Sequence, residues 1–337
     1  MRCSTWRGGT GRYPPVSTLL TALRDPMIGV LLFATGLALV LPATGAARTP
    51  IEAASSAAIF VLFLVNGMRI ARRDIARGFV NWRFFVPLGL WVFGFMAMAG
   101  WGFSQLAQTV LPPLIALGFV YLGTLPSTIQ SATSYTTLAG GNVALSVIGA
   151  ALINIAGVFL TAPLFGMLGG AGAANTGADV ILRIALLLIL PFAIGQALQG
   201  WTFDWIALRK AKIVWLDRFV IGLAVYVAFS GAVEQGIGRD LSLASGAWLV
   251  ALVLAFLLVA HLGAWMASAA LRLPLADRIA FLFAGSQKSV AIGAPLAALL
   301  FPPEQAGYVI APLLLYHLVQ LVIAAPVAGH LAGRARA

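Results

Sequence analysis

The chain has 337 residues, of which 61% are hydrophobic and 9% are charged, and its formal net charge is +11. A soluble domain needs a far more charged surface, so this composition excludes a soluble enzyme or nucleic-acid-binding protein and predicts a polytopic membrane protein. The only cysteine, Cys3, excludes an intrachain disulfide and a metal site built on several thiolates.

Ten apolar stretches of about twenty residues are separated by charged or Gly/Pro-rich segments and predict ten transmembrane helices. They cover residues 27–42, 53–70, 84–103, 111–138, 143–168, 180–200, 216–235, 247–271, 278–301 and 306–330. The first 26 residues are basic and not apolar, and we interpret them as a cytoplasmic tail before an ordinary first span, in preference to a cleaved signal peptide.

The positive residues predict the orientation of these spans. With the N-terminus in the cytoplasm, all but four of the 21 Lys and Arg residues lie in inner loops or tails, the exceptions being Arg48, Arg183, Arg239 and Lys288. We therefore expect both termini to be cytoplasmic, in a bacterial inner membrane. The basic segment 209–212 is expected to contact anionic membrane lipids.

Lys288 is the cation that falls inside a span. It belongs to FLFAGSQKSVAIGAP, residues 281–295, and lies about ten residues, or roughly 15 Å of helix rise, from the nearer end of span nine. Because no acidic residue falls at mid-membrane in the predicted spans, this amine needs another polar partner or an anion, which indicates a functional site. Gly285 and Pro295 are expected to interrupt the helix around it.

A second polar stretch, PSTIQSATSYTTLAGGN, occupies residues 126–142 in span four. Membrane helices use single Ser and Thr residues for packing, but nine polar side chains within eleven positions favour a binding function. Pro126, Gly140 and Gly141 are expected to interrupt span four as Gly285 and Pro295 interrupt span nine.

Spans four and nine are the fourth members of two groups of five. Because five is odd, the second group must cross the membrane in the opposite sense, which predicts two inverted five-helix repeats with broken helices at the binding site. The chain is accordingly divided into an N-terminal tail (1–26), a first repeat (27–168), a second repeat (169–330) and a C-terminal tail (331–337).

Several motifs resemble a known family. GNVALSV at 141–147, LTAPL at 160–164 and FLVNGMRI at 63–70, together with the two polar stretches, are similar to the bile acid:sodium symporter superfamily, in particular to the branch of solute carrier family 10 that holds its member seven and bacterial relatives. The resemblance implies an all-α protein with panel and core domains, in which spans four and nine are unwound and cross. It also implies a secondary transporter, not an enzyme, that moves a small organic anion by alternating access.

The positions that bind sodium in coupled members of that family are only partly matched. Ser146 and Gln287 agree with the family, whereas four positions are replaced, namely Ala132, Thr133, Ala150 and, in place of a carboxylate, Phe283. A dehydrated sodium ion needs about five or six oxygen ligands, so we do not expect it in the usual sites.

Three roles for Lys288 stay open. Its ammonium can replace the missing cation, and its protonation can couple transport to protons, because burial disfavours the charged form. It can attract an anionic substrate group, aided by half-helix N-termini, or it can be a structural lysine bound by carbonyl groups. In the first role its expected contacts are Ser286, Gln287, Thr133, Ser146 or Asn142.

The predicted binding site draws on spans four, five and nine, and no cofactor or metal is expected. Its residues are Lys288, Gln287, Ser286, Ser289, Thr133, Ser134, Thr137, Gln130, Asn142 and Ser146. Asn142 is also the expected N-cap of span five. His317 and Gln320, an i, i+3 pair in span ten, are a candidate proton relay.

Two other functions fit parts of the sequence. The replaced sodium ligands are compatible with a membrane regulator of ion or lipid homeostasis that has no transport activity. Ser286 or Ser289 beside Lys288 is compatible with the serine-lysine dyad of an intramembrane hydrolase, but no HExxH, GxSxG or paired membrane aspartates accompany it. A transporter is therefore the preferred prediction.

Overall fold

The computed structural model describes residues 25–70, 81–169, 182, 185–236 and 242–336, and the regular elements in these ranges are all helical. In chain order they are α2 (Pro26–Val40), η1 (Gly45–Ala47), α3 (Arg48–Arg69), α5 (Trp82–Gly89), η2 (Leu90–Phe95), α6 (Met96–Ala107), α7 (Pro113–Thr124), α8 (Ile129–Leu138), α9 (Val143–Gly169), η4 (Ala185–Ile189), α11 (Leu190–Leu208), α12 (Lys210–Glu234), α14 (Leu243–Ala270), α15 (Leu275–Ser286), α16 (Val290–Leu300) and α17 (Pro303–Arg336). Most of the predicted N-terminal tail, Arg183 and Arg239 lie outside the described residues.

Eight helical stretches in the described ranges are long and apolar enough to cross a membrane, and α7 with α8 makes a ninth if the two are counted as one span bent by 62°. The prediction of an all-helical, polytopic membrane protein is confirmed by these helices. The first predicted span corresponds to α2, whose 15 residues are fewer than a usual crossing helix needs. The count of ten spans therefore stays a prediction.

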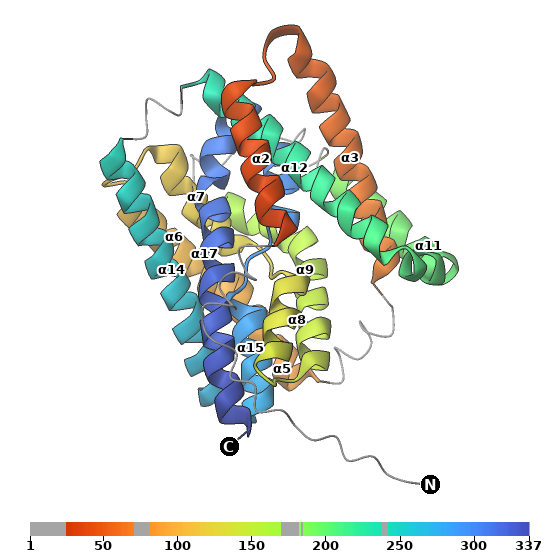
Figure 1. Ribbon diagram of the computed structural model, residues 1–337, viewed down its shortest axis with the longest axis vertical. Helices are drawn as coiled ribbons and strands as arrows, with labels where there is room; N and C mark the ends of the chain where they lie inside the picture. Colours follow the sequence, from red (N-terminus) through yellow and green to blue (C-terminus); the bar gives the residue numbers. More distant parts are fainter. Residues whose placement is uncertain (1–24, 71–80, 170–181, 183–184, 237–241, 337) are drawn as a thin grey trace.

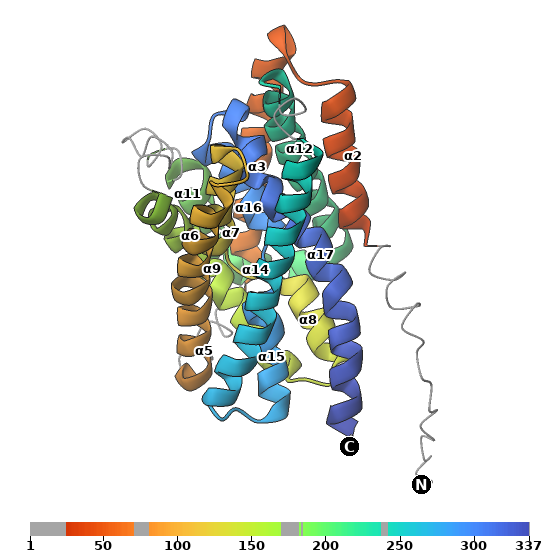
Figure 2. The same ribbon diagram turned by 90° about the vertical axis from the view of Figure 1, so that its left-hand side faces the viewer.

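The helices form two groups. The first holds α2, α3, α11 and α12, and the second holds α6, α7, α9, α14, α15 and α17. α3 packs along α11, and α12 contacts both α2 and α3, whereas α6, α7, α9, α14, α15 and α17 contact one another. Figure 1 shows α3 and α11 on the right-hand side and α6 and α14 on the left. α12 contacts α16 and α17 and so joins the two groups, and Figure 2 shows α8 beside the lower part of α17.

Glycines allow the closest helix contacts in both groups. A Cβ atom on Gly67 of α3 would lie 2.3 Å from the Phe192 carbonyl oxygen of α11, and one on Gly100 of α6 would lie 2.4 Å from the Phe119 carbonyl oxygen of α7. Small residues let membrane helices approach with good van der Waals packing, which lipid cannot replace. These contacts fix the distance between neighbouring helix backbones.

Candidate functional site

Two broken helices touch at the centre of the second group. The backbone between α7 and α8 is non-helical over residues 125–128, and that between α15 and α16 over residues 287–289. The Ser289 N–H donates a hydrogen bond of 3.0 Å to the Pro126 carbonyl oxygen, which joins one break to the other. Broken helices four and nine thus meet as predicted, with Pro126 in the first break.

Gly285 and Pro295 are not where the second helix breaks, so that part of the prediction is wrong. Pro295 lies within α16, which continues to Leu300, and membrane helices tolerate such a proline when neighbours satisfy the freed backbone groups. Gly285 lies within α15, where a Cβ atom would be 2.9 Å from Cδ1 of Trp91. This glycine therefore serves close packing.

Gly140 and Gly141 end α8 and do not break its interior. Gly140 has a φ of +74°, a left-handed conformation that glycine adopts without steric cost. A Cβ atom on Gly141 would lie 2.5 Å from Cγ2 of Ile279, so α8 ends in close contact with α15. Both glycines mark the turn into α9.

The Lys288 side chain is fully buried and is held by backbone oxygens of the other broken helix. Its Nζ donates to the carbonyl oxygens of Gly123 at 2.9 Å and Leu125 at 2.7 Å. Because α7 ends at Thr124, these carbonyls lose their helical partners, and the C-terminal end of a helix carries partial negative charge. The two carbonyls are therefore natural ligands for a cation.

The contacts of this amine are the carbonyl groups expected for a structural lysine, and the side-chain contacts expected if it replaces the coupling cation are wrong. Backbone oxygens exposed by the break reach Nζ and satisfy it without a carboxylate. Five side chains were expected to contact the amine but do not bind Nζ in the described structure, namely Ser286, Gln287, Thr133, Ser146 and Asn142.

Gln320 of α17 binds the backbone of Lys288. Its Oε1 accepts from the Lys288 N–H at 2.8 Å, and its Nε2 donates to the Lys288 carbonyl oxygen at 3.1 Å. Nε2 also lies 2.8 Å from Nδ1 of His317, so the predicted pair is in contact. Gln320 thus replaces both hydrogen bonds that the break removes, and its role in a proton relay stays a prediction.

Tyrosines that the sequence interpretation missed satisfy further carbonyls of span nine. The Tyr316 hydroxyl donates to the Ser286 carbonyl oxygen at 2.6 Å, and the Tyr121 hydroxyl to that of Gly293 at 2.6 Å. Both side chains are fully buried. A tyrosine deep within a membrane span needs a partner for its hydroxyl, and that need is the signal which could have identified them.

We expect Tyr316→Phe to lower the apparent melting temperature of the purified protein, because the Ser286 carbonyl at the end of α15 loses its donor. An unsatisfied buried carbonyl costs ~1–3 kcal/mol. Thermal unfolding in detergent measures the change. Tyr226→Phe is the control, since its hydroxyl binds the Leu41 carbonyl at an exposed position. Equal shifts for both variants would contradict this role of Tyr316.

The other predicted site residues divide by position. Asn142 caps α9 by accepting from the Leu145 N–H at 3.2 Å, and its Nδ2 donates to Asp277, so the expected cap is confirmed. The Ser146 hydroxyl accepts from Thr136. The Thr137 side chain is exposed, and its hydroxyl donates to the Thr133 carbonyl oxygen in the same helix. Five predicted residues instead line one cavity, namely Gln130, Thr133, Ser134, Ser289 and His317.

This cavity has a volume of about 740 Å³ and lies between the two helix groups. The first residues of α8 and α16 line it, so two half-helix N-termini, which carry partial positive charge, face it. Its charged lining residues are Arg69, Lys210, Arg218, Asp25 and Asp217. Arg69 donates to Asp217 at 2.7 Å, which leaves more positive than negative character around the space.

The oxygens near the crossing that correspond to the family's sodium ligands have other partners. The two carbonyls that could bind a cation already accept from the lysine amine. Oε1 of Gln287 accepts from the Ser131 hydroxyl at 3.0 Å, and the Ser146 hydroxyl accepts from Thr136. The oxygens that match sodium ligands are therefore already engaged by other groups.

Comparison of the sequence with known proteins gives a family and several relatives. The chain matches the SBF-like CPA transporter family (DUF4137) over residues 25–333. It belongs to this family. Its relatives include the "Putative symporter YfeH" of Escherichia coli, 34% identical over 92% of this chain and 93% of that protein, and the "Uncharacterized protein PA2026" of Pseudomonas aeruginosa, 32% identical over 88% and 90%.

A more distant relative is the "Sodium/bile acid cotransporter 7" of Mus musculus, 23% identical over 88% of this chain and 89% of that protein. The resemblance to the bile acid:sodium symporter superfamily is thereby confirmed. Family membership makes the chain an integral membrane transporter of a small molecule and places it outside the hydrolases.

Proposed function

We propose that this protein is a secondary transporter of a small organic anion, which binds in the 740 Å³ cavity beside the crossing of the broken helices. The N-termini of α8 and α16 line the cavity and supply backbone N–H groups and partial positive charge, the usual recognition of anions at helix ends. This arrangement is the observation that carries the proposal. It also favours transport over a purely regulatory role, because a regulator needs no such space.

The two helix groups are proposed to be the moving parts. In this proposal α2, α3, α11 and α12 form the panel and the remaining helices form the core, as two inverted five-helix repeats would give. Both termini are placed on the cytoplasmic side of a bacterial inner membrane. Alternating access then exposes the anion site first to one side and then to the other.

Lys288 is proposed to replace the coupling cation of sodium-dependent relatives. Its amine binds two carbonyls at the end of a half-helix, the type of ligand that sodium uses in transporters with broken helices. A coupling sodium ion binds and leaves as an ion, whereas a fixed amine can instead bind and release a proton. We therefore expect transport to depend on pH and not on sodium.

Uptake into proteoliposomes and thermal stabilisation of the purified protein test this function. A panel of organic anions is measured with sodium and pH varied independently, and at least one anion is expected to be stabilising and accumulated without sodium. Stabilisation by millimolar sodium, or the absence of uptake under every condition, would contradict the proposal.

A matched pair of lysines tests whether the cavity attracts anions. Lys210 lines the cavity and Lys212 lies two residues further on α12 without lining it. Lys210→Gln should raise the KM for the anion about threefold, since removal of a nearby exposed charge costs at most ~1 kcal/mol, whereas Lys212→Gln should leave it unchanged. The difference in KM between the two variants should be smaller at high salt, because salt screens the attraction between the lysine and the anion. Equal KM changes in both variants would remove support for the binding position.

A further inference from the structure

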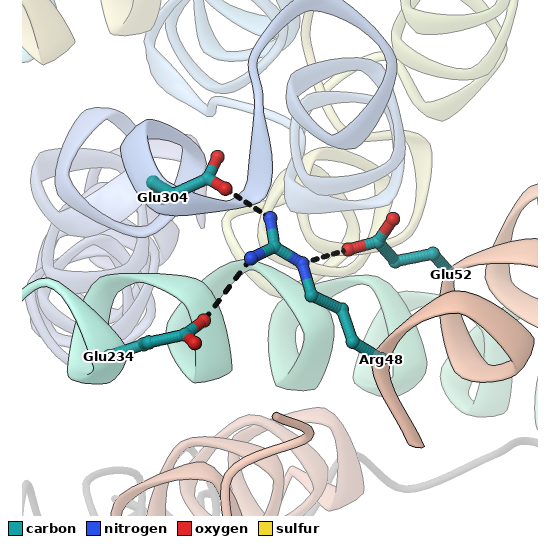
Figure 3. Close-up of polar contacts among 4 residues, drawn as sticks. All are labelled: Arg48, Glu52, Glu234 and Glu304. Atoms are coloured by element: carbon teal, nitrogen blue, oxygen red, sulfur yellow. Dashed lines mark hydrogen bonds and ion pairs between the residues drawn. The ribbon is translucent and has the colours of Figure 1, made fainter. Parts of the chain in front are cut away.

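An arginine with three acidic partners joins the two helix groups at the end opposite the anion cavity. Arg48, the first residue of α3, donates from Nε to Glu52 at 2.7 Å and from Nη1 to Glu234 at 3.2 Å, and its Nη2 binds Glu304. Figure 3 shows the guanidinium between the three carboxylates. We name these four residues the acidic clasp.

The clasp spans both groups of helices. Glu52 lies one turn along α3 and Glu234 is the last residue of α12, so these two belong with Arg48 to the same group. Glu304 lies in the first turn of α17, in the other group. The bond between Arg48 and Glu304 is therefore the contact of the clasp that must break if the two groups separate here.

The clasp covers the end of the molecule where the cavity does not reach. The α3 residues that line the cavity begin at Phe63, and those of α12 end at Ile221, far along both helices from Arg48 and Glu234. Figure 1 shows the connection between α2 and α3 at the top and the end of α17 at the bottom. The cavity thus lies away from the end of the molecule that carries the connection between α2 and α3.

Beside the clasp, the backbones of α12 and α17 are in close contact. A Cβ atom on Gly231 would lie 2.3 Å from the Pro303 carbonyl oxygen, and one on Gly307 would lie 2.6 Å from that of Ala228. α12 and α17 are therefore packed closely together beside the clasp.

We propose that the acidic clasp is the outer gate of the transporter, closed here, and that Glu304 must leave Arg48 before the cavity can open to the outer side. This inference rests on the proposed alternating access. The clasp side chains are between 27% and 38% exposed, so water can replace their hydrogen bonds and the gate can open. Once Arg48 is displaced, three neighbouring carboxylates repel one another and favour separation.

A cysteine in the cavity measures opening directly. In a Cys3→Ser background, Ala291→Cys places one thiol on α16 where it lines the cavity, and a membrane-impermeant maleimide is added from the outside of cells or from the inside of inverted vesicles. Glu304→Gln should raise the outside labelling rate about threefold, the effect of losing one partly exposed ion pair. Labelling from the inside should fall.

Glu52→Gln is the matched control, because it removes the same charge from the clasp but breaks a bond within α3 alone. It should leave outside labelling unchanged. The double exchange Arg48→Glu with Glu304→Arg restores one arginine among three carboxylates and should return labelling to the starting rate, which also excludes misfolding as the cause. Equal labelling in Glu304→Gln and Glu52→Gln would contradict the proposed gate. Failure of the double exchange of Arg48 and Glu304 to restore the starting rate would also contradict it.

The assay needs no substrate, so it separates the gate from the transported solute. If Glu304→Gln increases labelling but no anion is taken up, the result supports the proposed gate and contradicts the proposed solute. Anion uptake with unchanged labelling in Glu304→Gln would retain the transporter and contradict the gate.

Discussion

Lys288→Met is expected to reduce transport strongly while the protein still folds. The variant removes the two hydrogen bonds to the Gly123 and Leu125 carbonyls, and with them the cation that joins the broken helices. One hydrogen bond from a charged group is worth ~1.5–3 kcal/mol, so uptake should fall at least about tenfold. Removing a buried amine also removes its desolvation cost, which offsets part of the cost of leaving two carbonyls without a donor, so the variant should still fold.

The measurement is anion uptake by purified protein in proteoliposomes across a range of pH, together with thermal unfolding. Lys288→Arg is the informative companion, because it keeps the charge but replaces a compact ammonium by a planar guanidinium that does not match the two carbonyls. We expect Lys288→Arg to lose uptake to a similar extent. Unchanged uptake and pH dependence in Lys288→Met would leave this lysine with a structural role only.

The effect of sodium on stability is a second test of the role of Lys288. If the amine occupies the position of the coupling cation, sodium should not stabilise the unmodified protein at millimolar concentration. Stabilisation by sodium that persists in Lys288→Ala would show that the ion binds elsewhere, and the idea of a built-in cation would then be wrong.

Gly100→Ala is expected to be strongly destabilising, whereas Gly102→Ala, two residues along the same helix, is expected to be slightly stabilising. A Cβ atom on Gly100 would lie 2.4 Å from the Phe119 carbonyl oxygen and 2.9 Å from Cα of Gly123, whereas one on Gly102 would meet nothing within 4 Å. Overpacking costs ~1–3 kcal/mol. Alanine at the open helical position should instead stabilise by ~0.5–1 kcal/mol.

Gly100→Ala should also reduce uptake, because α7 must move away from α6 and Gly123 carries one of the carbonyls that bind Lys288. Thermal unfolding and uptake are measured for both variants under identical conditions. Similar melting temperatures for the two variants would mean that α6 and α7 are not held as closely as the backbone contact requires.

Much of the architecture could be predicted because it depends on local chemistry. Apolar stretches long enough to cross the bilayer identified the helices, and Pro126 marked a break, since proline removes a backbone donor wherever it lies. The same reasoning was wrong for Pro295, which lies within α16. A proline ends a helix only when the surrounding packing does not compensate for it, and that packing is not a local property.

A helical membrane protein with a buried lysine near broken helices could be predicted, because hydropathy and backbone hydrogen-bonding capacity are properties of each segment. Which groups bind that lysine depends on how distant segments pack. Its carbonyl partners lie 165 and 163 residues earlier in the chain, and Gln320, which binds its backbone, lies 32 residues later. Such partners become neighbours only when the helices pack, so no local pattern could identify them.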